Sequence, residues 1–147
     1  MSLIGGGGSG AGGAGNPVGG ANPAGTGSVL NYVGHHVYAY SGTFEASTTA
    51  QTMMEFTTGS QYIVGHITTN GAIQFSSTGG LKSAFQISMN SEVIAITQVD
   101  NQTDHSPGPP TLKLVIPPFT KIKVEVDSDD NNASVFSTAL FTGRVYA

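Results

Sequence analysis

The chain has 147 residues, enough for one domain, and carries 5 Lys and Arg against 9 Asp and Glu, a net charge of −4. This acidic balance argues against binding nucleic acid through a basic surface, which needs an excess of cations facing the phosphates. There is no Cys, which excludes disulfides and thiolate metal sites, and no apolar run approaches the ~20 residues that span a bilayer, so we expect neither a nucleic-acid nor a membrane partner.

The N-terminal residues have a composition of their own. Residues 5–28 are mostly Gly, Ala, Ser, Asn and Pro, and no charged residue precedes Glu45. The chain begins Met1-Ser2-Leu3-Ile4 without a basic or long apolar region, so we expect no signal peptide. Because such a segment has few side chains to bury and loses much backbone entropy on ordering, it cannot fold alone. We therefore expect an extended Gly-rich arm over residues 1–28 and a folded domain over 29–147.

This arm has two interpretations, a flexible tether or a segment that becomes ordered along a partner. In the second interpretation, sparse apolar residues anchor the arm and glycine allows the backbone to approach the partner closely. The expected partner-binding residues are Leu3, Ile4, Pro17, Val18, Pro23, Val29 and Leu30.

From Val29 onward the sequence is rich in Thr, Ser, Val, Ile, Tyr and Phe and shows no apolar stripe of helical period. The alternation is clearest where Ile122, Val124 and Val126 face one way and the intervening charged residues face the other, as in a strand with one wet face. We predict strands over 36–44, 52–58, 61–69, 72–76, 82–89, 92–99, 111–116, 120–127 and 134–146.

Turn residues separate these predicted strands. Gly59-Ser60 and Asn70-Gly71 predict two-residue hairpins, because Asn-Gly suits a turn in which both central residues have positive φ. Asn90-Ser91 predicts a further turn, and Pro117-Pro118 cannot lie within a central ladder.

Eight or so short strands at intervals of about 8–12 residues indicate an antiparallel β-sandwich or barrel. Residues 37–42 and 141–146 are similar in pattern, which favours pairing of the first and last strands, as in a jelly roll. An immunoglobulin sandwich fits less well, since it has fewer strands and the chain has neither Trp nor a Cys pair. The expected fold class is all-β, a jelly-roll sandwich preceded by the arm.

The candidate catalytic and metal-binding groups do not form a recognisable site. His35 and His36 are adjacent, so on a strand they face opposite sides, and neither His66 nor His105 supplies a third ligand at a familiar spacing. Residues 127–132 resemble half of a calcium loop, but Asn132 stands where an EF-hand needs Gly. A weak calcium site in that loop and a polar turn both remain open.

No Ser lies in a Gly-x-Ser-x-Gly elbow, and the Gly-rich arm contains no phosphate-binding motif. We therefore expect no enzyme activity, no cofactor and no metal. The aromatic residues Tyr38, Tyr40, Tyr62, Phe56 and Phe75 form either a sugar-stacking platform or part of the core.

Three segments carry a resemblance to known proteins. Residues 55–65 (EFTTGSQYIVG), 114–124 (LVIPPFTKIKV) and 141–146 (FTGRVY) look like virion structural proteins of tailed bacteriophages, particularly small jelly-roll capsid decoration, or cement, proteins. The resemblance covers about residues 36–147. It implies a β-sandwich on the outer capsid surface of the virion, often a homotrimer, that bridges subunits of the major capsid protein.

Three function hypotheses follow, of which the third is a cupin-type enzyme that metal analysis of the purified protein would test. In the first, the chain is a virion structural protein whose arm binds the major capsid protein and whose charge-poor body self-associates. In the second, it is a receptor- or glycan-binding module of a phage fibre or spike, in which loops 100–110 and 127–133 recognise a host glycan. Jelly rolls serve both roles, so the fold does not decide between them.

Overall fold

The computed structural model describes residues 30–73, 82–100, 111–128 and 135–146. Within these residues every regular element is a strand, which confirms the all-β prediction. None of them forms a helix that is long and apolar enough to cross a membrane. The strands are β1 (Asn31–Val33), β2 (His36–Tyr40), β3 (Phe44–Ala46), β4 (Gln51–Thr57), β5 (Tyr62–Ile73), β6 (Lys82–Met89), β7 (Glu92–Asp100), β8 (Thr111–Ile116), β9 (Lys121–Ser128) and β10 (Val135–Tyr146).

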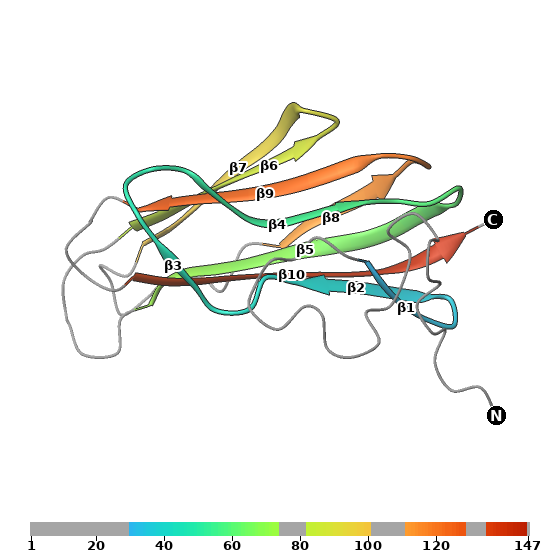
Figure 1. The fold of residues 1–147 in the computed structure, drawn as a ribbon, viewed down its shortest axis with the longest axis horizontal. Helices are drawn as coiled ribbons and strands as arrows, with labels where there is room; N and C mark the ends of the chain where they lie inside the picture. Colours follow the sequence, from blue (N-terminus) through green and yellow to red (C-terminus); the bar gives the residue numbers. More distant parts are fainter. Residues whose placement is uncertain (1–29, 74–81, 101–110, 129–134, 147) are drawn as a thin grey trace.

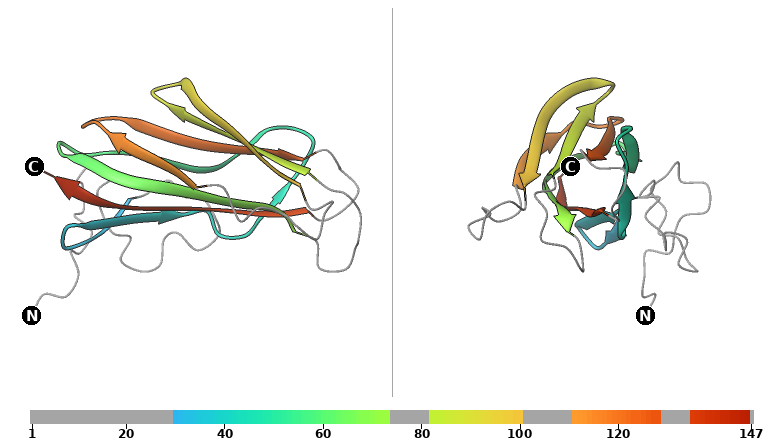
Figure 2. Two further views of the ribbon diagram at one scale, coloured as in Figure 1. Left: turned by 180° about the vertical axis from the view of Figure 1, so that it is seen from behind. Right: turned by 90° about the vertical axis from the view of Figure 1, so that its left-hand side faces the viewer.

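The strands form two antiparallel sheets that pack face to face (Figure 1). The six-stranded sheet has the order β1-β2-β10-β5-β8, with β3 paired to the start of β10, and the four-stranded sheet has the order β4-β9-β6-β7. The end-on view of Figure 2 shows that the two sheets enclose a common interior. This arrangement is a β-sandwich.

The connectivity is that of a jelly roll. From β3 onward, each connection between successive strands leads from one sheet to the other, except that β6 and β7 stay together as a hairpin. The predicted pairing of the first and last long strands is confirmed, because Ala39 of β2 lies opposite Phe141 of β10. Without the short strands β1 and β3, each sheet has four strands, in the orders β2-β10-β5-β8 and β4-β9-β6-β7, which is the arrangement of the expected jelly roll.

The core lies between the sheets and follows the period-two pattern of the strands. Ile122, Val124 and Val126 of β9 are fully buried, as their alternation predicted. They share the core with the tilted ring pair of Phe56 and Phe141, whose centroids are 4.8 Å apart. Burial of this apolar surface is the main favourable term for a domain of this size.

Two glycines allow β5 and β10 to approach closely next to the Phe141 ring. Gly65 and Gly143 lie directly opposite each other on these strands. A Cβ on Gly65 would come within 2.5 Å of the Thr142 carbonyl oxygen and 2.8 Å of the Phe141 ring. Glycine is therefore required here by space.

Some turn predictions are confirmed. Asn90 and Ser91 join β6 to β7 with φ values of 50° and 73°, the left-handed conformation that a tight hairpin demands. Pro117-Pro118 lies between β8 and β9, outside both ladders. The same connection is held by Thr58, whose Oγ1 accepts a hydrogen bond from the Thr120 amide at 2.9 Å.

The predicted hairpin at Asn70-Gly71 is wrong, because both residues lie inside the continuous strand β5. Gly71 serves close packing instead, since a Cβ there would meet the Phe85 ring at 2.7 Å and Ser83 at 2.8 Å. Gly59-Ser60 is not a hairpin either, because it joins β4 to β5, which belong to different sheets.

Two strand boundaries also differ from prediction. The expected strand over 36–44 is divided into β2 and β3, with Gly42 between them at a φ of 71°. The short strand β1 was not predicted, since three residues are too few for a periodic pattern. It pairs with β2 through Asn31 and Tyr38.

Candidate functional site

Most of the predicted partner-binding residues lie outside the described residues: Leu3, Ile4, Pro17, Val18, Pro23 and Val29. Leu30 is described, and its assignment to the arm is wrong. Its side chain is fully buried and belongs to the core of the chain itself, so it is not available to a partner. The core therefore begins at the first described residue.

The outer surface of the six-stranded sheet is the first candidate site. Alternate residues of β2, β5, β8 and β10 point away from the core and form one continuous face, which we call the tyrosine face. Its members are His36, Tyr38, Tyr40, Tyr62, Val64, His66, Thr68, Thr111, Lys113, Val115, Leu140, Thr142, Arg144 and Tyr146.

The tyrosine face combines exposed rings with a few cations. Tyr62, Tyr146 and Tyr40 are 51%, 47% and 40% exposed. The rings of Tyr38 and Tyr40 are parallel within 2° with centroids 6.1 Å apart, and the Arg144 guanidinium lies 6.0 Å from the centre of the Tyr146 ring. None of these members is Asp or Glu, and the nearest acid on the same outer surface in the described part of the chain is Glu45 of β3, which lies opposite Phe136. The tyrosine face thus combines apolar groups with cations on an acidic chain.

The edge of the four-stranded sheet is the second candidate site. β7 pairs with β6 on one side and with no other strand of the described part of the chain. Val93, Ile94 and Ile96 of this strand are 49%, 40% and 69% exposed, and we call these three residues the β7 edge. β7 contains no Lys, Arg or Pro, residues that block many such edges in monomeric proteins, although its pairing with β6 has a register shift at Ile94. The exposed apolar side chains of this strand are suited to contact with another chain.

A turn near one end of the sheets exposes a further aromatic residue. Phe119 is 73% exposed and has a φ of 53°, a conformation that is unusual for a bulky residue. Its amide donates a hydrogen bond of 2.9 Å to the Gly59 carbonyl, which fixes the turn. Sequence reasoning missed Phe119, since neither its exposure nor its φ follows from the neighbouring prolines.

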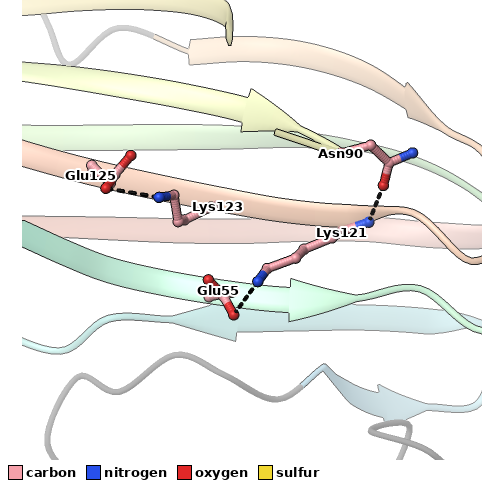
Figure 3. A network of polar contacts seen from close by, with 5 residues as sticks. All are labelled: Glu55, Asn90, Lys121, Lys123 and Glu125. Atoms are coloured by element: carbon pink, nitrogen blue, oxygen red, sulfur yellow. Dashed lines mark hydrogen bonds and ion pairs between the residues drawn. The ribbon is translucent and has the colours of Figure 1, made fainter. Parts of the chain in front are cut away.

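The outer surface of the four-stranded sheet carries two ion pairs (Figure 3). Lys121 Nζ lies 2.8 Å from Glu55 Oε1, and Lys123 Nζ lies 2.8 Å from Glu125 Oε1. The Lys121 amide also donates to Asn90 Oδ1 at 2.9 Å. The two lysines and two glutamates line a shallow polar depression with Gln86 and Ser88. Because the opposite charges neutralise one another, this surface offers little net attraction to a charged partner.

The histidines do not converge. His35 lies in the turn between β1 and β2, His36 on β2 and His66 on β5, and all three are exposed. His66 Nε2 lies 3.0 Å from Thr142 Oγ1. No group of three or more His, Asp or Glu suited to a metal ion occurs within the described ranges. His105 and most of the acidic stretch at 127–132 lie outside those ranges, with only Asp127 and Ser128 placed, at the end of β9.

Among the residues that the structure describes, Tyr32 has a clearly shifted pKa. Tyr32 of β1 is partly buried against the core, and this burial raises the pKa of its phenol, while a hydrogen bond with the Gly59 backbone acts in the opposite direction. The phenol therefore stays neutral and joins β1 to the connection between β4 and β5.

The comparisons with known proteins do not identify a family. No family model matches the chain, and no curated protein matches it. The solved structures that match include dimeric latent PorU from Porphyromonas gingivalis, at 15% identity and a TM-score of 0.37. That match covers 73% of this chain but only 11% of the PorU chain. So low a score carries no argument about function.

The five aromatic residues that were considered as a sugar-stacking platform do not all lie on one surface. Tyr38, Tyr40 and Tyr62 lie together on the tyrosine face, Phe56 is buried in the core, and Phe75 is outside the described residues. The cations of the face were not predicted, because only the register of the strands places Lys113 and Arg144 on the same side of the sheet.

Proposed function

We propose that the chain is a structural subunit of a virion, a capsid decoration protein that acts without enzymatic chemistry. In this proposal the N-terminal arm (residues 1–28) binds the major capsid protein, and the jelly-roll body binds copies of itself, as a homotrimer on the outer capsid surface. The resemblance of the strand and turn segments to phage cement proteins supports this role.

The observation that carries the proposal is the β7 edge. β7 has nine residues, pairs with no strand other than β6 among the described residues, and exposes Val93, Ile94 and Ile96, which favours aggregation in a free monomer. In an assembly, the same edge is covered by a neighbouring copy. Only 10% of the residues are charged, so a strand edge covered in this way loses few strongly hydrated groups.

Co-sedimentation with particles assembled from the major capsid protein tests the two contacts separately. The full chain should sediment with the particles, and the chain lacking residues 1–28 should fold but stay in solution, because Leu30 keeps its place in the core. The variant Ile94→Lys/Ile96→Lys should bind particles at lower occupancy, since the arm remains but contacts between copies are lost. Equal occupancy of the truncated and full chains would refute the arm's role.

A second function, recognition of a host glycan by a fibre or spike module, is favoured by the tyrosine face. Exposed aromatic rings on a flat sheet are suited to pyranose rings, because the negative face of an aromatic ring attracts the partly positive C–H groups of a sugar. The loops first expected to carry this role lie mainly outside the described residues. Binding of the purified protein to immobilised glycans, with and without Tyr62→Ala, tests this alternative.

A further inference from the structure

Among the described residues, the charged members of the tyrosine face, apart from its histidines, are both cations. The whole chain carries a net charge of −4, yet Lys113 and Arg144 occur on this face without any carboxylate. Glu45, an acid of the same sheet, is opposite Phe136, four residues along β10 from Leu140, or about 13 Å away. A surface that is positive on an acidic protein attracts an anionic partner selectively.

The register places these cations around one centre. Lys113 of β8 lies directly opposite His66 of β5, and Thr142 of β10 lies opposite His66 on the other side. Arg144 is two residues further along β10, opposite Val64 and His36. From strand spacing and rise, the Cα atoms of Lys113 and Arg144 are about 12 Å apart, so their long side chains can serve neighbouring groups of one ligand.

Aromatic rings lie on both sides of these cations. Tyr62 and Tyr146 pair across β5 and β10 at one end of the face, and Tyr38 and Tyr40 lie side by side along β2. From Tyr62 to Thr68 the exposed part of β5 extends about 20 Å, the length of several sugar units. Hydroxyls occur on the same face, as at Thr68 and Thr111, whose Oγ1 atoms are 3.2 Å apart and belong to exposed side chains.

We propose that the tyrosine face binds an acidic polysaccharide, with sugar rings on the tyrosines and carboxylate or sulfate groups on Arg144 and Lys113. The inference rests on the second proposed function, glycan recognition, and names the class of glycan. Arg144 offers a planar donor that matches a carboxylate or sulfate oxygen pair. A neutral glycan needs no such cations. An acidic peptide has no use for a flat row of rings and hydroxyls, because extended peptides add to sheet edges.

Native electrophoresis through gels that contain a polysaccharide tests the proposal with the full chain. We expect gels with polygalacturonate or dextran sulfate to retard the protein, and gels with neutral dextran to leave its mobility unchanged. Added salt should weaken the retardation, since exposed ion pairs are screened. Arg144→Gln and Lys113→Gln should each weaken binding about tenfold, as expected for a charge-assisted contact. The matched control, Lys121→Gln/Lys123→Gln on the opposite sheet, should behave as the wild type.

Tyr62→Ala should weaken binding to polygalacturonate without changing the thermal midpoint, since its side chain is exposed. Retardation by neutral dextran alone would be compatible with glycan recognition but would contradict the proposal that the glycan is acidic. No retardation in any gel would overturn both. Equal retardation by poly-glutamate, or equal loss in the Lys121→Gln/Lys123→Gln control, would show attraction of polyanions in general and also overturn the proposal.

Discussion

The two outer surfaces of the sandwich differ although they are built on one core. The four-stranded sheet carries Glu55, Lys121, Lys123 and Glu125 in opposite-charge pairs. The tyrosine face instead carries exposed rings and the two cations Lys113 and Arg144. Solubility alone would favour charges of both signs on both surfaces. This is the difference expected if the four-stranded surface faces water and the tyrosine face binds the proposed ligand.

The largest expected effect concerns the close packing of β5 against β10 on the core side of the tyrosine face. Gly65→Ala should lower the free energy of unfolding by about 2 to 3 kcal/mol, because its Cβ would overlap the Thr142 carbonyl oxygen. The control Val64→Ala, on the exposed side of the same strand, should change it by about 0.5 kcal/mol or less. Denaturant titration measures both. Equal stability of the two variants would contradict the close packing of β5 against β10.

A smaller effect is expected on the charged surface. Lys121→Gln breaks the ion pair between Lys121 and Glu55, in which the side chains are 49% and 37% exposed. It should lower the free energy of unfolding by about 0.5 kcal/mol or less. Arg144→Gln on the tyrosine face should cost no more, because its role is binding. A loss above about 2 kcal/mol for Arg144→Gln, in the same titration, would make that residue structural and weaken the contrast between the surfaces.

The smallest effect concerns Tyr32. Burial raises the pKa of the Tyr32 phenol in the folded protein above its value in the unfolded chain. The neutral phenol therefore contributes fully to stability at pH values below the pKa of the unfolded chain. This contribution is lost as the pH rises through the pKa of the folded protein. Above pH 10 the unfolding midpoint should therefore fall more steeply for the wild type than for Tyr32→Phe. Thermal melts of both proteins from pH 8 to 11 measure the difference. Parallel curves would show that Tyr32 does not titrate differently in the two states.

The sequence was sufficient to predict the fold class because its strands are short, regularly spaced and separated by turn residues. The alternation of Ile122, Val124 and Val126 predicted the buried side of β9 directly. At Asn70-Gly71, by contrast, the local turn signal was overridden by packing, since Gly71 lies against the Phe85 ring from the other sheet.

The candidate sites were harder to predict. In Tyr62-Ile63-Val64 the residues on both sides of the strand are large and apolar or aromatic, so the sequence does not say which side faces water. Only the register shows that Val64, Arg144 and His36 form one row. Likewise, nothing local distinguishes β7 as an edge strand from an internal one, because edge position depends on the order of the whole sheet.

The mass of the full chain in solution tests the central claim, that this protein is an assembly subunit, most directly. Sedimentation velocity over a range of concentrations should show a trimer of the 15.0 kDa chain. For the variant Ile94→Lys/Ile96→Lys, the concentration at which the trimer dissociates should be at least about tenfold higher than for the wild type, because each Lys would have to be desolvated at the contact. Gln98→Lys on the same strand serves as the control. A wild-type chain that stays monomeric throughout, or a double variant that associates as the wild type does, would contradict the account.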